Sequence, residues 1–286
     1  MAELTTSRKI ALARTARVLV MLGRRVLGAG DQAVVHRGGI KWDLDLSEGI
    51  DFAIYLLGGF ELRTLKLYQQ LVVPGSVVLD IGANIGAHTL PFAKLVGSHG
   101  RVVAFEPTQY AFGKLQRNLA LNPELASRVS AYQVALLESR LADVPRQIYS
   151  SWPLEAATDL HSVHGGKMQS TQGAHAATLD QMVEVIGLER VNFIKVDVDG
   201  HEPEVLAGAL ETIGRFRPRI LLEWAPYLFE HKDRLLEDAM RGLRDLGYRA
   251  YVAGSAVSGD VPKDRHTLFT PLTQGASVNL LLEVPA

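Results

Sequence analysis

The sequence predicts an α/β fold in which a seven-stranded, mostly parallel sheet has helices on both faces. From residue 71 onward, short apolar runs typical of buried strands alternate with segments whose apolar residues recur at helical spacing. Strands separated by helices favour a parallel sheet that is covered on both sides. The last two strands have no helical pattern between them, which predicts an antiparallel hairpin at the edge of the sheet.

Each element follows from its local pattern. Seven apolar runs are predicted as strands: 76–82, 101–107, 130–136, 191–197, 219–224, 248–253 and 278–284. The segment up to residue 96 is predicted to be helical with its first turn at 87–91, because Pro91 is tolerated only near a helix start. Helical spacing also marks the segment that Pro123 stops, a helix after residue 200 and a helix at 233–246 closed by Gly247.

The chain divides into an N-terminal segment and a larger α/β domain. At 286 residues with 47% hydrophobic content it can bury a full core. Residues 1–70 are predicted to form a basic helix and a cap, and residues 71–286 the ligand-binding domain. Residues 138–177 break the strand and helix rhythm, and we interpret them as an insertion, which in such a fold is usually functional or flexible.

Charge and cysteine content exclude some functions. The chain has no cysteine, so disulfides, thiolate metal sites and a cysteine nucleophile are excluded, and a reducing cytoplasm fits. Six of the 30 Lys and Arg residues and one of the 31 acids lie in residues 1–30, so the remaining 24 basic and 30 acidic residues give the body a net charge of −6. We therefore expect no nucleic-acid partner, because that requires a basic face on the body.

The basic leader RKIALARTARVLVMLGRRVLGAG admits two interpretations. Residues 8–27 could form an amphipathic helix that rests on an anionic membrane surface, giving peripheral membrane contact. The alternative is a helix packed on the domain or a partly disordered segment. The longest apolar run, residues 18–22, is too short to span a bilayer. We therefore expect a soluble, cytoplasmic protein.

The stretch DIGANIG after the first strand indicates a cofactor site. Ligands of open α/β sheets bind beyond the carboxyl ends of the strands, where Gly82 and Gly86 allow a tight turn and close approach. The spacing D-x-G-x-N-x-G departs from the dinucleotide fingerprint, because Asn84 stands where the middle glycine should be. Asp80 at the strand end would repel a pyrophosphate but suits a cofactor that carries an ammonium and a sulfonium.

A second acid, Glu106, follows at the end of the second strand. A carboxylate at this place accepts hydrogen bonds from both ribose hydroxyls of a nucleoside. S-adenosylmethionine satisfies both acids, whereas NAD satisfies only Glu106. We therefore predict S-adenosylmethionine as the cofactor.

The stretch IKVDVDGHE ends the fourth strand with three carboxylates within six residues. Asp197, Asp199 and Glu202 repel one another and are costly to bury unless something binds there. Asp197 is expected beside the first strand, next to the positively charged cofactor, which favours its ionised form.

Six motifs follow one another between residues 40 and 226: WDLDLSEGIDFAIYLLGGFE, VVLDIGANIGAHTLPFA, RVVAFEPTQYAFGKLQRNLALNP, TLDQM, IKVDVDGHEPEVLAGAL and RPRILLEW. Through these motifs the chain resembles the FkbM family of S-adenosylmethionine-dependent methyltransferases. The resemblance implies a Rossmann-like class I methyltransferase fold and transfer of a methyl group to a hydroxyl of a sugar, glycolipid or natural product. The family more commonly has Glu where this chain has Asp199, which shortens that side chain by one methylene.

O-methylation needs a base near the acceptor hydroxyl. His201 is predicted to be that base, because its ordinary pKa of about 6.5 suits proton acceptance at neutral pH. Asp197 or Glu202 would orient it or replace it. The alternative is structural, with Asp197 binding only cofactor and Glu202 in the first turn of the next helix, favoured by the helix dipole.

A divalent metal ion is a rival for the acidic strand end. Asp197, Asp199 and Glu202, with His231, carry donors of the kind that magnesium or calcium accepts. The resemblance does not imply a metal, and we expect none. In the insertion, the spacing of His161, His164 and His175 matches no helix-borne zinc motif.

The roles of two tryptophans and the type of reaction each allow more than one interpretation. Trp152 and Trp224 could each stack on a sugar ring or belong to the core. The scaffold does not fix the acceptor, so an N-methyltransferase is one rival. A non-catalytic S-adenosylmethionine-binding protein is a second, and a dinucleotide-dependent oxidoreductase is a third.

Overall fold

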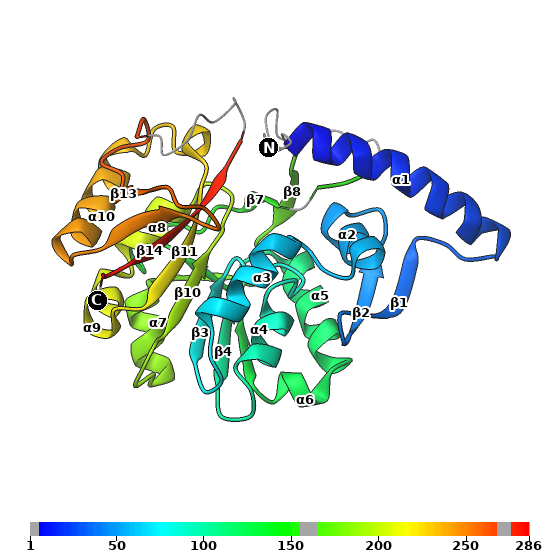
Figure 1. Cartoon of the computed structure of the whole chain (residues 1–286), viewed down its shortest axis with the longest axis horizontal. Helices are drawn as coiled ribbons and strands as arrows, with labels where there is room; N and C mark the ends of the chain where they lie inside the picture. Colours follow the sequence, from blue (N-terminus) through cyan, green and yellow to red (C-terminus); the bar gives the residue numbers. More distant parts are fainter. Residues whose placement is uncertain (1–5, 151, 155–164, 268–275, 286) are drawn as a thin grey trace.

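The central feature of the computed structural model, which describes residues 6–150, 152–154, 165–267 and 276–285, is an eight-stranded sheet. Its strands are β3 (Val77–Ile81), β4 (Arg101–Phe105), β5 (Val129–Tyr132), β10 (Phe193–Val196), β11 (Arg219–Trp224), β12 (Arg249–Val252), β13 (Ser258–Asp260) and β14 (Val278–Glu283). They lie in the order β13-β12-β14-β11-β10-β3-β4-β5 (Figure 1). The five strands from β11 to β5 are parallel, and β14 is antiparallel to both of its neighbours. The predicted α/β fold with a mostly parallel sheet is confirmed.

Two details of the sheet differ from the prediction. The predicted hairpin is antiparallel as expected, but β14 lies between β11 and β12, and the short strand β13 forms the edge. The run 130–136 is not one strand. It divides at Gln133 into β5 and β6 (Val134–Leu136), and β6 pairs in parallel with β9 (His175–Ala177). The Gln133 amide donates to the backbone oxygen of Gln172, which holds the chain at this division.

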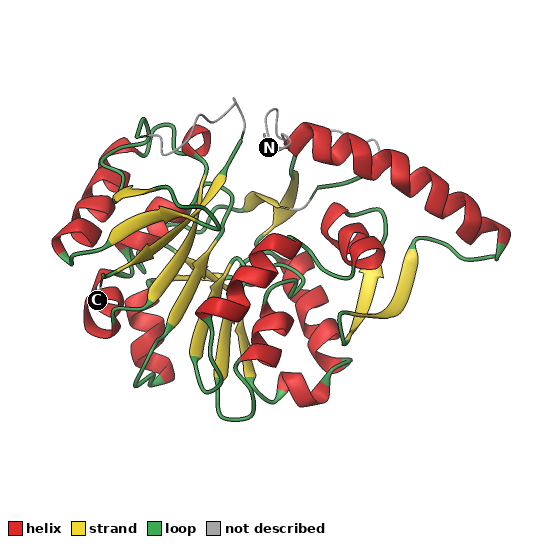
Figure 2. Cartoon of the chain, in the orientation of Figure 1, coloured by secondary structure: helices red, strands yellow, loops and turns green. Residues whose placement is uncertain are grey.

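Helices cover both faces of the sheet, as predicted (Figure 2). One face packs against α7 (Leu179–Ile186), α8 (Glu202–Ala207), α9 (Leu210–Phe216) and α10 (Asp233–Asp245). The other packs against α3 (Leu62–Leu71), α4 (Thr89–Leu95), α5 (Gln109–Ala120) and α6 (Pro123–Ala126). A short 3₁₀ turn, η1 (Pro226–Leu228), follows β11.

The helix expected after residue 200 is two helices, α8 and α9. They separate at Gly208, where an added Cβ would lie 2.3 Å from the Leu137 backbone oxygen. This close approach of two backbones is not visible in the apolar spacing, which continues unbroken from Val205 to Ile213.

The N-terminal elements are α1 (Thr6–Val26), β1 (Gln32–Arg37), β2 (Ile40–Asp45) and α2 (Gly49–Leu57), and β1 pairs with β2 outside the main sheet. Their apolar side chains form a second core together with Ile85, Ala87 and Leu90, which follow β3. The leader is therefore a helix that packs one side on the body. Because this core adjoins the turn after β3, the N-terminal elements can supply side chains to a site there.

Residues of the predicted insertion form β7 (Gln147–Ser150) and β8 (Lys167–Ser170), an antiparallel pair, followed by β9. The strand-like piece RQIYS thus becomes β7. His161 and His164 lie outside the described residues, and His175 is an exposed residue at the start of β9.

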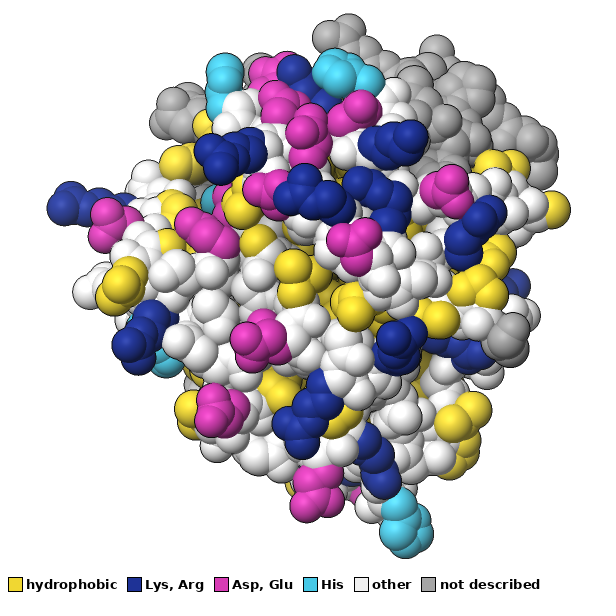
Figure 3. All heavy atoms as spheres, turned by 90° about the vertical axis from the view of Figure 1, so that its left-hand side faces the viewer, with side chains coloured by type: hydrophobic (Ala, Val, Ile, Leu, Met, Phe, Trp, Pro, Cys, Tyr) yellow, Lys and Arg dark blue, Asp and Glu magenta, His cyan; other side chains and the backbone are white. Residues whose placement is uncertain are grey.

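The side of the molecule that is on the left in Figure 1 carries basic and acidic side chains intermixed, with hydrophobic ones scattered among them (Figure 3). In the part of the chain that the structure describes, no helix is long and apolar enough to cross a membrane.

Candidate active site

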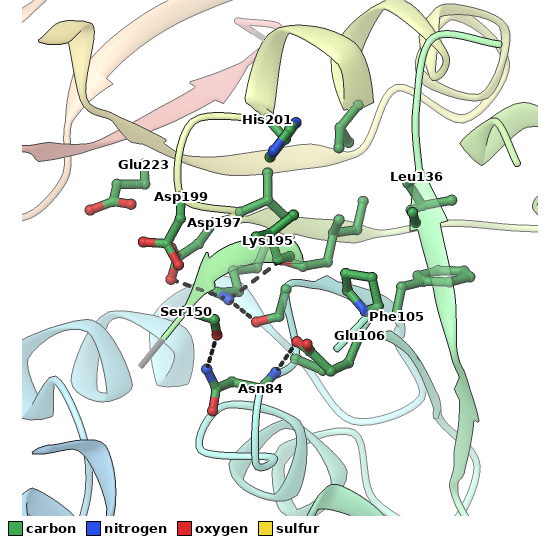
Figure 4. Close-up of a pocket in the computed structure, with 18 of the residues that line it drawn as sticks. Asn84, Phe105, Glu106, Leu136, Ser150, Lys195, Asp197, Asp199, His201 and Glu223 are labelled. Carbon is green, nitrogen blue, oxygen red and sulfur yellow. Dashed lines mark hydrogen bonds and ion pairs between the residues drawn. The ribbon is translucent and has the colours of Figure 1, made fainter. Parts of the chain in front are cut away.

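A pocket lies at the carboxyl ends of β3, β4, β10 and β11, where parallel strands place their following loops together (Figure 4). Of the eight residues that the sequence predicted for cofactor or catalysis, five line it: Gly82, Asn84, Glu106, Asp197 and His201. Asp80, Gly86 and Glu202 do not line it, and Asp199, predicted only as a metal ligand, does. The topology has therefore gathered side chains from four separate strands at one edge.

The turn after β3 is built for close approach. Gly82 has a φ of 79°, and an added Cβ would lie 1.8 Å from the Asp197 backbone oxygen, so no other residue fits. Asn84 has a φ of 49°, a conformation that asparagine tolerates better than most residues. Its side chain donates to Ser150 Oγ at 3.3 Å, which ties the turn to β7. Gly86, with a φ of 93°, completes the turn without reaching the pocket wall.

Glu106 is buried at the end of β4 and held by three donors. The backbone N–H of Asn84 donates to Oε2 at 2.9 Å, and the N–H and hydroxyl of Thr108 donate to Oε1 at 2.9 and 2.5 Å. Burial raises the pKa of Glu106, and the donors from Thr108 and Asn84 oppose that rise. The fixed carboxylate faces the pocket, as a ribose-binding acid must.

A buried lysine, Lys195, lies among the acids of β3 and β10. Its Nζ lies 3.3 Å from Asp197 Oδ2 (Figure 4). It also donates to the Gly82 backbone oxygen at 2.9 Å and lies 3.5 Å from Asp80 Oδ1. Sequence reasoning missed it, although the parallel register of β10 with β3 sets Lys195 directly opposite Asp80. Asp80 also accepts the Thr89 hydroxyl at 2.6 Å.

Lysine therefore supplies the positive charge that the sequence interpretation assigned to a cofactor at Asp80. Two carboxylates, Asp80 and Asp197, share one ammonium, which leaves negative charge for a bound cation. Burial raises the pKa of Asp80 although Lys195 opposes it. Burial also disfavours ionised Asp197, but Lys195 and a hydrogen bond from Glu223 together hold its pKa below the ordinary value.

Glu223, at the end of β11, forms a carboxyl pair with Asp197. Burial, and then the charge of Asp197, raise the pKa of Glu223 well above its usual range. Burial and Asp197 do the same to the pKa of Asp199, which follows β10 with a φ of 50°. Glu223 is then the protonated member of the pair and donates to Asp197, which lessens the repulsion between the carboxylates.

His201 lies on the pocket wall at the start of α8. Its Nδ1 is 3.5 Å from Glu204 Oε1 and 3.5 Å from Lys232 Nζ. Lys232 also pairs with Glu204 at 2.6 Å and donates to the Gly200 oxygen at 2.8 Å. Burial disfavours the ionised form of Glu204, but hydrogen bonds from His201 and Lys232 outweigh it and lower its pKa. Glu204, and not Glu202, is the carboxylate beside His201.

Glu202 is fully buried and turned toward the loop before it. Its Oε1 accepts the Val198 N–H at 2.9 Å and its Oε2 accepts the Gly200 N–H at 3.0 Å. Because both oxygens bind backbone and the side chain is outside the pocket wall, Glu202 holds the loop that carries Asp199. Within the described residues, no three acids or histidines converge as a metal site would require.

His88 is a pocket residue that sequence reasoning missed. It is 4% exposed, its Nδ1 lies 3.1 Å from the Tyr68 hydroxyl, and its Nε2 has no hydrogen-bond partner in the described structure. Burial, and then Lys195, lower the pKa of His88 to about 3, so the ring is neutral. Tyr68 is fully buried and keeps its proton, since burial raises its pKa. With the Tyr68 hydroxyl as donor to Nδ1, the neutral ring would carry its proton on Nε2 and present Nε2–H to the pocket.

Aromatic side chains from distant segments complete the wall. Phe60, between α2 and α3, packs against His88 and against Trp152, with ring centroids 5.8 and 5.7 Å apart. Trp152 lines the pocket. Trp224 is fully buried against Phe229 in the core, so the suggestion that it could stack on a sugar ring was wrong.

Comparison with known proteins identifies the family to which this chain is similar. The profile of the methyltransferase FkbM domain matches residues 80–250. Methyltransferase sdnD of Sordaria araneosa is 30% identical over 206 residues, which cover 62% of this chain and 78% of that protein.

Two further relatives are similar over about half of this chain. The hexuronic acid methyltransferase AglP of Haloferax volcanii is 30% identical over 154 residues, 52% of this chain and 56% of that protein. The 2-O-methyltransferase NoeI of Sinorhizobium fredii is 26% identical over 168 residues, 54% of this chain and 67% of that protein. The matched region contains the glycine turn, Glu106 and the carboxylates of β10 and β11, and the chain belongs to the FkbM methyltransferase family.

Proposed function

We propose that this methyltransferase binds S-adenosylmethionine in the pocket at the strand ends and methylates a hydroxyl group of a sugar, glycolipid or natural product. The observation that carries the proposal is the pocket itself. It combines a glycine turn, a fixed carboxylate at Glu106 and a net negative group around Lys195 at one edge of the sheet. The names of AglP and NoeI, which specify a hexuronic acid and a 2-O position, favour a hydroxylated acceptor.

The residues present fit this cofactor. Glu106 would accept the ribose hydroxyls, and the apolar side chains of Phe105, Leu136 and Ile148, which line the same pocket, would contact the adenine. Asp197 would face the positive charges of the methionine part, since Lys195 neutralises only one of the two carboxylates there. When bound, S-adenosylmethionine supplies a methyl group on a sulfonium, which makes that methyl carbon electrophilic.

We assign proton acceptance to His201. The low pKa of Asp197 makes its carboxylate a weak base, whereas His201 lies on the pocket wall beside Glu204. Glu204 would accept the Nδ1–H of His201, which turns the unprotonated Nε2 into the base that takes the hydroxyl proton. Glu202 would hold the loop, Asp80 would position Lys195, and the Nε2–H of His88 would bind an oxygen atom of the acceptor or of the cofactor carboxylate.

The test is calorimetric titration of the purified protein with S-adenosylmethionine. Glu106→Gln and Asp197→Asn should each weaken binding at least about tenfold, because each removes a charged hydrogen-bond partner. Glu124→Gln serves as the matched control, since Glu124 is 87% exposed on α6. NAD should not bind.

Transfer of labelled methyl groups to hydroxylated glycans and glycolipids then tests the acceptor class. His201→Ala should lower kcat about 10² to 10⁴-fold while cofactor affinity stays unchanged. Unchanged turnover in His201→Ala would instead favour an amine acceptor, which needs less help from a base. A folded wild-type protein that binds no S-adenosylmethionine would refute the proposal.

A further inference from the structure

Helix α1 is apolar on two opposite sides. Its inner side packs on the body, where Met21 is buried and Ala13, Ala16 and Val20 are partly buried in the second core. Arg17 also faces inward and donates to the Leu46 backbone oxygen at 2.7 Å. These contacts fix the rotation of the helix about its axis and therefore determine which of its side chains face outward.

The outer side presents large hydrophobic residues to solvent. Leu12, Leu19 and Val26 recur every seven residues and are 61%, 69% and 85% exposed, and Leu22 beside them is 57% exposed. Of the fourteen exposed large hydrophobic side chains in the described residues, six lie between residues 12 and 27. Soluble proteins rarely leave such a contiguous stripe uncovered, so it marks an interaction surface.

The charge around this stripe has one sign. The helix sequence TSRKIALARTARVLVMLGRRV contains no acid. Arg14 and Arg25 are exposed and lie eleven residues apart, close to three helical turns, so they flank the same edge of the stripe. Arg24 makes two shorter hydrogen bonds to the body, to the backbone oxygens of Gly30 and Gln32 at 2.9 and 3.0 Å, whereas Arg14 makes one long contact, at 3.5 Å, with the Pro153 backbone oxygen.

We propose that the outer face of α1, formed by Leu12, Val18, Leu19, Leu22 and Val26 with Arg14 and Arg25, lies on an anionic membrane surface. A helix held parallel to a bilayer can bury its apolar stripe at the boundary of headgroups and acyl chains while arginines contact lipid phosphates. Figure 1 shows α1 as an outermost element, with its long axis along the upper edge of the molecule.

A second copy of the chain fits this face less well. A symmetric contact between two α1 helices would set arginines against arginines with no acid on either helix to offset them. One stripe of five side chains is also narrow compared with the roughly 800 Å² that each partner of a stable dimer buries. A membrane surface provides both the negative charge and a continuous apolar layer.

The face also lies on the side of the molecule that carries part of the pocket wall. The Arg14 guanidinium donates to the Pro153 backbone oxygen at 3.5 Å, and the preceding residue, Trp152, lines the pocket. Membrane contact through α1 would therefore bring one wall of the active site close to lipid. The membrane surface itself is inferred from α1 alone and stands whether or not the proposed acceptor is right.

Flotation of the full-length protein with lipid vesicles tests the inference. The protein should bind vesicles of equal parts phosphatidylglycerol and phosphatidylcholine, bind pure phosphatidylcholine weakly, and dissociate as salt is raised. Leu19→Glu with Leu22→Glu should abolish binding. Arg14→Glu with Arg25→Glu should weaken it at least about 25-fold, since each basic residue near an anionic surface contributes about fivefold.

The matched control is Val185→Glu, which changes an 81% exposed valine on α7 and should leave binding unchanged. Circular dichroism and thermal melts establish that each variant is folded, and Leu19→Gln with Leu22→Gln replaces any charged variant that is not. Equal binding by wild type and the α1 variants would overturn the proposal. So would a wild-type dimer, measured by light scattering, that the same variants convert to monomers.

Discussion

Single residues in the pocket carry the most specific chemistry, and His88 is the clearest case. It follows Gly86 and Ala87 in the turn after β3, and its ring is held between the Tyr68 hydroxyl and the edge of Phe60. In the tautomer that accepts the Tyr68 hydroxyl at Nδ1, the ring offers one donor, Nε2–H, that nothing in the described protein accepts. A buried unpaired donor costs free energy, so a bound ligand that accepts it gains affinity.

His88→Phe should lower kcat/KM about 10 to 100-fold, because it removes a hydrogen bond worth roughly 1–3 kcal/mol to the bound state. His88→Gln, whose amide can place an N–H near the position of Nε2, should retain part of that activity. Calorimetry with S-adenosylmethionine shows whether the cofactor or the acceptor accepts the hydrogen bond from Nε2–H. Weakened cofactor binding assigns the donor to the cofactor carboxylate, whereas an unchanged affinity with a raised acceptor KM assigns it to the acceptor. Full activity in His88→Phe would contradict a role in either.

Lys195 reduces the net negative charge of the acidic strand end. Three acids in IKVDVDGHE had suggested that a ligand must neutralise them, but the same nine residues also contain the lysine that does part of this. Burial opposes the charge on Lys195, yet Asp197 and Asp80 raise its pKa, so it stays protonated. The negative charge left for a ligand is therefore smaller than a count of carboxylates indicates.

At the scale of elements, the loop between β10 and α8 sets the geometry of the acids. Val198 and Gly200 both donate to Glu202, which fastens the loop to the first turn of α8. Gly200 has a φ of 101°, and an added Cβ would lie 3.0 Å from Leu228 Cβ, so a larger residue at this position would strain the loop. The position of Asp199 in the pocket depends on this support.

Glu202→Gln should change the pH dependence of stability. Burial raises the pKa of Glu202 to about 7 from an ordinary 4.5. The folded state then holds a proton that the unfolded chain releases, so this contribution to stability is present below pH 4.5 and is lost as pH rises through 7. The free energy of unfolding of wild type relative to Glu202→Gln should fall by about 3 kcal/mol over that interval.

Urea unfolding at about pH 5, 6, 7 and 8 measures this difference in the free energy of unfolding. Glu124→Gln, on the exposed α6, should run parallel to wild type at every pH. If the Glu202→Gln curve is also parallel to wild type, the carboxyl has an ordinary pKa and does not hold the proton.

At the scale of the whole molecule, the N-terminal elements are fastened to the α/β domain by a polar seam over α5. The Asn118 side chain accepts the Asp43 N–H at 2.7 Å and donates to the Ile85 oxygen at 2.9 Å, and Asn122 binds both backbone groups of Lys41. At the centre of the seam, Lys114 pairs with Asp51, and both side chains are almost completely buried.

Lys114→Met should destabilise the protein by roughly 3–5 kcal/mol, because it leaves the Asp51 carboxylate buried and unpaired. Adding Asp51→Asn should recover more than half of the loss, since Asn keeps the oxygen that accepts the Asp45 N–H at 2.6 Å. Arg117→Gln is the matched control. Arg117 lies on the same helix as Lys114 and forms an ion pair with Asp43 of β2, but it is 57% exposed, so the cost of the substitution should be below about 1 kcal/mol.

Thermal and urea unfolding of the four proteins measure these costs. An equal loss from Lys114→Met and Arg117→Gln would show that burial does not strengthen the central pair. Failure of Asp51→Asn to recover stability would mean that the loss comes from packing and not from the unpaired charge. Because Ile50, next to Asp51, lines the pocket, the seam also determines where one wall of the site stands.

Local sequence patterns predicted most of the sheet and part of the site. Apolar runs and helical spacing depend on neighbouring residues alone, so they predicted the strands of the parallel core, helices such as α10, and the helical leader. The glycine turn and Glu106 were predicted for the same reason, because a strand end, a tight turn and an acid are adjacent in the chain. The membership in the FkbM family was predicted from the same motifs and is confirmed.

Only the tertiary structure decided which side chains meet. Phe60, His88, Trp152 and Glu223 come from four distant segments, and no spacing rule brings them to one pocket. Glu204 rather than Glu202 faces His201 because the loop backbone occupies both oxygens of Glu202. Lys195 neutralises Asp80 because the register of two parallel strands sets them opposite each other. Contacts of this kind depend on how elements pack across the sheet, and that information is spread over the whole chain.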